Sequence, residues 1–229
     1  LVVTPASLVY NWCEEIHRFA PKLQAAPVSG TQTERQLILE KQGDYDILVT
    51  SYDLLKRDID QYEALKFDFQ ILDEAQYIKN HTTAASKAVK VIHSKTRLAL
   101  TGTPIENRLS ELWSIFDYLM PGFLYKYETF KKSFETPIVK NKDMAASERL
   151  RQMTAPFILR RLKKDVLRDL PEKLEEVRYA KPEKKQLDLY NGQLVHMQKL
   201  LKNQNEDDFN KNKLKVLAEL TRIRQICCD

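Results

Sequence analysis

The stretch Phe69-Gln70-Ile71-Leu72-Asp73-Glu74 ends an apolar run in two adjacent carboxylates, and Ala75-Gln76 follows directly. Further along the chain, the run Leu98-Ala99-Leu100 ends in the turn sequence Thr101-Gly102-Thr103-Pro104. Short apolar runs that are bounded by polar and turn-forming residues are typical of buried strands. The two stretches therefore predict two strands that each end in side chains able to do chemistry.

Strand-like runs of this kind alternate with helical patterns from residue 1 to about residue 101. Strands that are apolar throughout and alternate with helices are typical of parallel sheets with helices on both faces. The sequence therefore predicts an α/β fold, a doubly wound parallel sheet, with strands at 1–4, about 25–28, 47–50, 69–72 and 97–100. Two amphipathic helix faces are expected between them: Leu8, Trp12, Ile16 and Phe19, with Ser7 as the cap, and Ala84, Ala88, Val91 and Ile92.

The character of the sequence changes after Pro121-Gly122, where aromatic residues alternate with lysines. Helix-like, basic sequence follows as far as Leu170-Pro171, and Glu175–Tyr179 is expected to form one short strand. From Glu183 onward the pattern is helical, interrupted by the polar stretch Asn203–Asn212, which is expected to be an exposed loop. The sheet is thus followed by a mostly helical extension.

The composition is that of a folded chain without membrane or disulfide signals. The 229 residues are 43% hydrophobic, and no run approaches the roughly 20 apolar residues needed to cross a bilayer. Cys13, Cys227 and Cys228 fit neither a disulfide framework nor zinc-ligand spacing. We therefore expect a reducing compartment, the cytoplasm of a prokaryote or the nucleus of a eukaryote, and no membrane partner.

Positive charge is concentrated in one window of the chain. The net charge is +5, and the window from Arg149 to Arg168 carries +6 of it, which leaves −1 for all other residues. A concentrated basic patch favours a polyanionic partner, although a solvated helix face is the alternative. The basic residues of the window are Arg149, Arg151, Arg160, Arg161, Lys163, Lys164 and Arg168.

Polar residues follow the predicted strands at the points where these strands end. Ligands of open parallel sheets bind beyond the carboxyl ends of the strands, which lie along one edge. We therefore expect these segments to converge on one site: Thr4-Pro5, Thr50-Ser51-Tyr52, Asp73-Glu74 and Thr101–Pro104.

The paired acids suit phosphoryl transfer, which needs a cation near the phosphate oxygens and a group that orients the attacking water. Asp73 would hold Mg²⁺ and Glu74 would act on the water. The alternative is a pair of acids that complement a helix dipole. For Thr101–Pro104 the alternatives are a structural turn and a hydroxyl-lined sensor of the phosphate state.

Taken together, the chain resembles the Swi/Snf family of DNA-dependent ATPases. The stretches that carry the resemblance run in family order over nearly the whole chain: LVVTPASLVYNW (1–12), ILVTSY (47–52), LDEAQYIKN (72–80), LALTGTPIENRLSELW (98–113), FILRRLKKDV (157–166) with LPEK (170–173), and LTRIRQIC (220–227). The resemblance implies a RecA-like sheet at 1–120, a helical protrusion at 121–181 and the start of a second motor lobe at 182–229. It also implies ATP and Mg²⁺ as cofactors, and double-stranded DNA, with DNA-bound proteins, as partners.

The resemblance further assigns roles to individual positions. Asp73 and Glu74 would act on magnesium and water, and Gln76 with Thr101, Gly102 and Thr103 would couple hydrolysis to movement. Residues expected to face the DNA backbone are Thr4, Pro5, Thr50, Ser51 and Tyr52. Arg160 and Arg161 would either contact DNA or brace the two lobes through carboxylates.

Two features depart from the family pattern. Gln76 stands where many relatives carry His, and it keeps one donor and one acceptor without a titratable group. None of the five glycines precedes a lysine, so the phosphate-binding loop Gly-x-x-x-x-Gly-Lys-Ser/Thr is missing from these residues. In the family that loop lies upstream of the first matching stretch, and we expect this chain alone not to hydrolyse ATP.

The alternatives to a DNA translocase are another helicase-like motor, of the restriction type or RNA-dependent, and a non-catalytic relative that only binds DNA or a partner.

Overall fold

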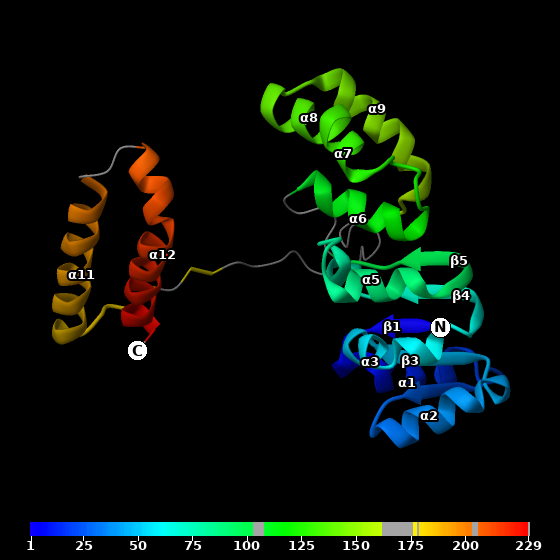
Figure 1. Cartoon of the computed structure of the whole chain (residues 1–229). Coiled ribbons are helices and arrows are strands. Elements are labelled where there is room, and N and C mark those ends of the chain that lie inside the picture. Colours follow the sequence, from blue (N-terminus) through cyan, green and yellow to red (C-terminus); the bar gives the residue numbers. More distant parts are fainter. Residues whose placement is uncertain (103–107, 162–175, 178, 203–205, 229) are drawn as a thin grey trace. The chain divides into compact units, whose positions relative to one another are not determined.

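The computed structural model describes residues 1–102, 108–161, 176–177, 179–202 and 206–228, with the side chains of 202–212 excepted. These residues form two compact units, Leu1–Arg160 and Arg161–Asp229, and each is described by itself. The first unit contains a five-stranded sheet and a helical part, and the second contains two long helices (Figure 1). The three-part division at residues 120 and 181 stays a prediction.

The sheet consists of five parallel strands in the order β2-β3-β1-β4-β5. Val2 of the central strand lies opposite Val49 on one side and Ile71 on the other. The predicted parallel, doubly wound sheet is confirmed. The strands are β1 (Val2–Thr4), β2 (Ala25–Val28), β3 (Ile47–Ser51), β4 (Lys66–Leu72) and β5 (His93–Ala99).

The strands β4 and β5 begin earlier than their apolar runs predicted. Lys66 pairs with His93, and the ladder continues to Leu72 and Ala99. The first residues of both strands are largely exposed, so their backbone pairs without requiring apolar side chains. Hydrophobicity marked only the part of each strand that is nearest the site.

Alternate strand residues point to opposite faces of the sheet and so divide the core. Val3, Leu48 and Leu72 belong to the main cluster, whereas Val2 and Val49 pack with Val9 of helix α1. Helix α1 (Val9–Phe19) therefore lies on one face. The helices that contribute buried residues to the main cluster are α2 (Gln32–Glu40), α3 (Tyr52–Arg57), α4 (Ile59–Tyr62), α5 (Ala84–Val91) and α6 (Leu109–Leu119).

Part of the α1 face has no cover among the described residues. Phe69 lies two residues before Ile71, which packs in the α1 cluster, and Leu98 lies beside Ile71 in the ladder. Phe69 is nevertheless 55% exposed, Leu98 44% and Leu100 43%. The described helices thus leave this part of the α1 face of β4 and β5 exposed, whereas Gln70 and Leu72 on the opposite face are buried.

The two predicted helix faces needed correction. Ser7 lies inside a 3-10 turn, Ala6–Leu8, and does not cap α1, whose first turn has no side-chain cap. Phe19 is 74% exposed, because Val9 and not Phe19 completes the apolar face of α1. In α5, Ala84 and Val91 are exposed, and the buried positions are Ser86, Ala88 and Val89. Four of the predicted face positions are nevertheless confirmed as packed or buried: Trp12, Ile16, Ala88 and Ile92.

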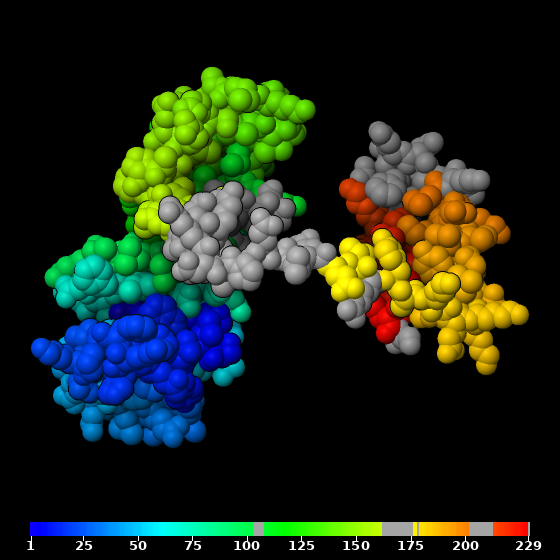
Figure 2. All heavy atoms as spheres, turned by 180° about the vertical axis from the view of Figure 1, so that it is seen from behind, coloured from blue at the N-terminus to red at the C-terminus, as the bar shows by residue number. Residues whose placement is uncertain are grey.

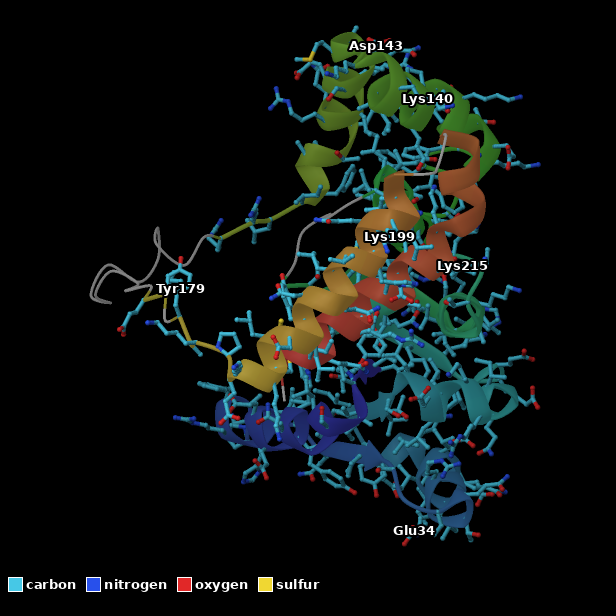
Figure 3. All side chains as sticks on the ribbon, turned by 90° about the vertical axis from the view of Figure 1, so that its left-hand side faces the viewer. Glu34, Lys140, Asp143, Tyr179, Lys199 and Lys215 are labelled. Atoms are coloured by element: carbon cyan, nitrogen blue, oxygen red, sulfur yellow. The ribbon has the colours of Figure 1, made fainter. Side chains whose placement is uncertain are left out.

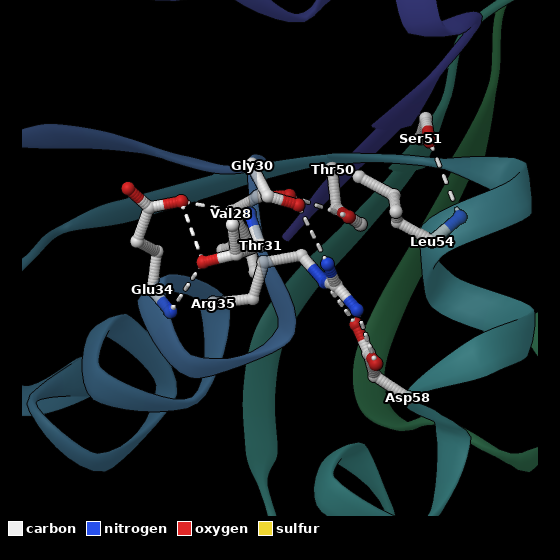
Figure 4. Close-up of polar contacts among 9 residues, drawn as sticks. All are labelled: Val28, Gly30, Thr31, Glu34, Arg35, Thr50, Ser51, Leu54 and Asp58. Atoms are coloured by element: carbon white, nitrogen blue, oxygen red, sulfur yellow. Dashed lines mark hydrogen bonds and ion pairs between the residues drawn. The ribbon is translucent and has the colours of Figure 1, made fainter.

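A buried ion pair ties α2 to the segment between α3 and α4 (Figure 4). Arg35 donates from Nε to Asp58 Oδ2 at 2.6 Å and from Nη2 to Oδ1 at 2.8 Å, and its third nitrogen donates to the carbonyl of Gly30. Gly30 has φ 88°, a backbone conformation that favours glycine. Thr31 and Glu34 form a reciprocal capping box at the start of the same helix.

The helical part of the first unit has a core of its own. Figure 2 shows this part (green to yellow-green) beside the sheet and its covering helices (blue to green). It consists of α6, α7 (Tyr127–Phe130), a π-helical turn (Lys131–Glu135), α8 (Thr136–Asn141) and α9 (Met144–Thr154). Its buried residues are Leu112, Trp113, Phe116, Leu124, Phe130, Phe134 and Leu150.

The predicted basic window is only partly described. Arg149 places its guanidinium 4.8 Å from the centre of the Phe134 ring, and Arg151 pairs with Glu148 at 2.8 Å. Lys163, Lys164 and Arg168 lie outside the described residues. The two basic residues on α9 thus make local contacts within the helical part.

The second unit is a pair of helices, α11 (Lys184–Lys202) and α12 (Glu206–Cys228). Gln186 of α11 donates to the carbonyl of Ile226 at 2.7 Å, and Gln193 bonds to Glu219. Figure 3 labels Lys199 on α11 and Lys215 on α12.

Two predictions for this unit change. The stretch expected to be an exposed loop is helical at 206–212, where α12 begins, and 203–205 lie outside the described residues. Of the strand expected at 175–179, residues 175 and 178 lie outside the described residues, and 176, 177 and 179 are not in a strand. Tyr179 is 92% exposed (Figure 3). Among the described helices, none is long and apolar enough to cross a membrane.

Candidate functional site

Asp73 lies at the carboxyl edge of the sheet, where three donors hold its carboxylate. Thr4 Oγ1 donates to Asp73 Oδ2 at 3.0 Å, and the indole Nε1 of Trp12 donates to the same oxygen at 2.8 Å. The other oxygen, Oδ1, accepts from the backbone N–H of Glu74 at 2.9 Å. The side chain is therefore oriented by groups from β1, from α1 and from its own loop.

The backbone of Asp73 is held as firmly as its side chain. Its N–H donates to the carbonyl of Val3 at 2.8 Å, and its carbonyl accepts from the hydroxyl of Tyr52 at 2.8 Å. Burial strongly raises the pKa of Tyr52, with nearby Tyr118, Asp73 and Glu74 adding to the shift, so the phenol stays a donor at any working pH. Tyr52 also stacks on Tyr77, with ring centres 4.9 Å apart and nearly parallel planes.

Glu74 has an uncommon backbone conformation. Its φ and ψ are 49° and 53°, in the left-handed region that few residues other than glycine adopt. Such conformations cost on the order of 1 to 3 kcal/mol and persist where the surroundings impose them. Here the next residue, Ala75, is held by an N–H bond to the carbonyl of Leu100 at 2.8 Å. The backbone conformation therefore sets the direction in which the Glu74 side chain leaves the chain.

A chain of side-chain hydrogen bonds joins Glu74 to the end of β5. Gln76 donates from Nε2 to Glu74 Oε2 at 2.6 Å. On its other side, Gln76 Oε1 accepts from the hydroxyl of Thr101 at 2.9 Å. Because a carboxylate only accepts, the amide of Gln76 can satisfy both neighbours in one orientation. The predicted convergence of Asp73, Glu74, Gln76 and Thr101 is thus present in the structure.

The hydroxyls of the predicted DNA-facing residues are turned inward. Thr50, fully buried, donates to the carbonyl of Val28 at 3.2 Å. Ser51, 2% exposed, accepts from the N–H of Leu54 at 3.2 Å and caps α3. Thr4 and Tyr52 are equally buried and bind Asp73. These residues make buried hydrogen bonds at the carboxyl edge of the sheet, and their contact with DNA stays a prediction.

The remaining predicted positions are more exposed or lie outside the described residues. Pro5 is half-buried at the start of the turn that leads to α1, and Gly102 is exposed. Arg160 and Arg161 are exposed on either side of the division between the two units. Thr103 lies outside the described residues. The roles of these five residues in DNA contact or coupling stay predictions.

Sequence reasoning missed two residues at this edge. Trp12 was assigned to an apolar helix face, and its indole N–H reaches Asp73. Tyr77 follows the acidic motif, stacks on Tyr52 and is 52% exposed. A tryptophan one turn into a helix after a strand gave no signal of a polar role, because only the fold brings it beside Asp73.

The donor set fits magnesium bound with help from a substrate. Among the described residues, no group of three or more His, Cys, Asp or Glu side chains could hold a metal. Magnesium is commonly bound by one or two carboxylates together with phosphates and water. Asp73 has about four acceptor sites, three of which are used, so roughly one remains on Oδ1.

Comparisons with known proteins all point to one family. The SNF2-related domain matches residues 1–229. An uncharacterized ATP-dependent helicase of Mycoplasma genitalium is 39% identical over 227 residues, which are 99% of this chain and 21% of that protein. The TATA-binding protein-associated factor mot1 of Schizosaccharomyces pombe is 40% identical over 191 residues, which are 79% of this chain and 10% of that protein.

A solved structure agrees with these sequence matches. The SWI2/SNF2 ATPase core of Sulfolobus solfataricus, in complex with double-stranded DNA, matches 98% of this chain and 46% of its own length. The TM-score is 0.67 and the sequence identity 40%. The chain thus spans about a fifth or less of those two relatives and under half of the solved core.

Proposed function

The chain belongs to the SNF2-related domain family, and we propose that it forms part of an ATP-dependent motor that moves along double-stranded DNA. The observation that carries the proposal is the pair Asp73 and Glu74 beside the hydrogen-bond chain through Gln76 to Thr101. This hydrogen-bond chain joins the two carboxylates needed for phosphoryl transfer to the end of the neighbouring strand β5. A movement at the end of β5 would therefore change the position of the Glu74 carboxylate.

Asp73 would hold magnesium through the acceptor site left on Oδ1. When bound, the ion would neutralise charge on the phosphate oxygens. Thr4 and Trp12 hold the other oxygen, so the carboxylate is oriented before a ligand arrives. Preorganised groups of this kind lower the reorganisation that a reaction requires.

Glu74 would orient the attacking water and accept its proton. One of its oxygens, Oε2, accepts from Gln76, which leaves Oε1 for the water. Movement of Thr101 would shift Gln76 and, through it, the carboxylate that activates the water. Gln76, Thr101, Gly102 and Thr103 would in this way couple the phosphate state to motion of the segment after β5.

Double-stranded DNA is the proposed polyanion. The similar core from Sulfolobus solfataricus was solved with double-stranded DNA, and two relatives are named as TATA-binding protein-associated factors, so DNA-bound proteins are proposed as further partners. Contacts to the DNA backbone carry no sequence information and suit a motor that steps along any duplex. Arg160 and Arg161, both exposed, would add phosphate contacts or brace the lobes.

The chain would contribute the first motor lobe at 1–120, a helical protrusion at 121–181 and the start of the second lobe at 182–229. No glycine here precedes a lysine, so the loop that cradles the phosphates is not among these residues. We propose that residues 1–229 alone do not hydrolyse ATP. A DNA motor would work where the DNA is, in the nucleoid of a prokaryote or the nucleus of a eukaryote.

The test uses the intact protein and its ATPase rate with duplex DNA, single-stranded DNA or RNA. We expect strong stimulation by duplex DNA without strand separation. Glu74→Gln should abolish turnover and spare ATP binding, because the amide cannot accept the proton. Unchanged turnover in Glu74→Gln would remove Glu74 from the mechanism, and stimulation by RNA alone would replace the translocase by an RNA-dependent motor.

A further inference from the structure

Trp12 makes the shorter of the two contacts to Asp73 Oδ2. The distance from its indole Nε1 to that oxygen is 2.8 Å, against 3.0 Å for Thr4 Oγ1. Both donors meet one oxygen, while Oδ1 accepts, among the described residues, only from the N–H of Glu74. The two halves of the carboxylate are therefore unequal, with Oδ2 occupied by donors and Oδ1 partly open.

The position of the Trp12 indole is set by the packing of α1. Val9 is 1% exposed and packs on Val2 and Val49 of the sheet, and Ile16 continues the same face two turns later. The indole ring lies between them and also borders a hollow lined by Val2, Ile16 and Ile71. Helix α1 thus carries the donor to the carboxylate with little freedom.

An indole is well suited to orient a carboxylate that must bind a cation. It donates one hydrogen bond, accepts none and carries no charge. Lysine or arginine at this place would neutralise Asp73 and repel a metal ion. A hydroxyl, as in Thr4, can rotate and accept as well as donate, so it fixes the carboxylate less strictly.

We propose that Trp12 is a positioning residue for the metal-binding carboxylate. With Thr4, it holds Asp73 Oδ2 so that the remaining acceptor site, on Oδ1, is presented to the metal ion. The inference rests on the proposed function, because it takes Asp73 as the magnesium ligand. It adds a direct link between α1, which follows the predicted DNA-facing segment Thr4-Pro5, and the metal site.

The first test is Trp12→Phe in the intact protein, which keeps an aromatic ring and removes the N–H. Outer partners of metal ligands typically contribute 10- to 100-fold to metal affinity. We expect the Kd for Mn²⁺, measured from the free-ion electron paramagnetic resonance signal with a non-hydrolysable ATP analogue present, to rise about tenfold. The Mg²⁺ concentration that half-saturates the ATPase should rise in parallel.

The matched control is Trp113→Phe. Trp113 also donates through Nε1, to the carbonyl of Tyr125 at 3.1 Å, in the separate core of the helical part. Trp113→Phe makes the same chemical change as Trp12→Phe, and the Mn²⁺ affinity of this control variant should equal that of the wild type. A Trp12→Phe variant with a lowered melting temperature but a wild-type Kd for Mn²⁺ would reduce Trp12 to packing and overturn the proposal.

Two further variants keep the outcomes distinct. Thr4→Val removes the second donor to Oδ2 and, like Trp12→Phe, should raise the Kd for Mn²⁺. It replaces Trp12→Phe as the test if that variant does not fold. Asp73→Asn should weaken binding most, and Trp12→Phe should add nothing to it. If Asp73→Asn leaves the Kd unchanged, the metal assignment in the proposed function fails; if only Trp12→Phe and Thr4→Val leave it unchanged, the positioning role alone fails.

Discussion

Thr101 and Gln76 are joined by a hydrogen bond of 2.9 Å between the hydroxyl of one and the side-chain oxygen of the other. The bond connects the segment after β5 with the loop after β4. Gln76 makes a second hydrogen bond, to the carboxylate of Glu74. Neither residue is a proton donor or acceptor in the proposed reaction. Their contact is instead the physical route by which two strand ends can respond together.

Gln76→Ala should uncouple ATP turnover from DNA in the intact protein. Without the amide, the hydrogen bond from Gln76 to Glu74 Oε2 and the one from Thr101 to Gln76 are both lost. We expect the DNA-stimulated ATPase rate to fall by roughly a hundredfold, with ATP affinity retained, because misplacing a catalytic group by about 1 Å can lower the rate by that factor. Gln76→His is the control, since neutral histidine offers one donor and one acceptor. Full stimulation in Gln76→Ala would contradict the coupling role.

Two buried serines should respond oppositely to the same change. Ser114 Oγ donates to the carbonyl of Ile78 at 2.6 Å, so Ser114→Ala leaves that carbonyl unpaired and should cost about 1 to 2 kcal/mol. Ser86 Oγ is buried with no hydrogen-bond partner among the described residues. Ser86→Ala should be neutral or stabilising by up to about 1 kcal/mol. Urea unfolding followed by circular dichroism measures both, and equal losses would contradict the assignment.

Replacing one member of the buried pair Arg35 and Asp58 should lower the free energy of unfolding much more than replacing both. Their side chains are 7% and 3% exposed, so Arg35→Met leaves a carboxylate buried without its partner. We expect a loss of about 3 to 5 kcal/mol in the free energy of unfolding. The double variant Arg35→Met/Asp58→Leu should recover most of it, because no charge is left unpaired. A double variant as unstable as the single one would show that shape and not charge determines the effect.

The parallel sheet and its chemical edge could be read from the sequence. Apolar runs ending in Asp73-Glu74 and Thr101-Gly102 predicted strands, and parallel strands bring their carboxyl ends together. Helix phase could not be read as well. Phe19 matched the stripe of α1, but the residues of α1 that pack on the sheet are Val9, Trp12, Cys13 and Ile16, and the Phe19 ring is 74% exposed.

The burial of polar residues could not be predicted from the sequence either. Thr4, Thr50 and Ser51 were expected at the surface because hydroxyls suit phosphate contacts, whereas all three are buried and hydrogen-bonded. The residue type alone does not specify whether the hydroxyl of a threonine in a central strand faces a ligand or a neighbouring loop. The contact of Trp12 with Asp73 spans 61 positions and depends on the order of strands, which local patterns do not specify.

Cys13 should be modified slowly and only at high pH. It is half-buried in α1, next to Trp12, and burial raises the pKa of its thiol, with the neighbouring Glu14 carboxylate adding to the effect. Because the thiolate is the reactive form, a raised pKa means little reaction at pH 8 and a rate that increases as the pH passes the ordinary thiol value. Cys227 and Cys228 are exposed and should be labelled first by iodoacetamide at pH 8. Peptide mass spectrometry over time distinguishes the three thiols, and labelling in urea, where burial is lost, provides the control. Equal labelling of Cys13 and the exposed pair in the native protein at pH 8 would mean that α1 detaches from the sheet, and with it the indole that holds Asp73.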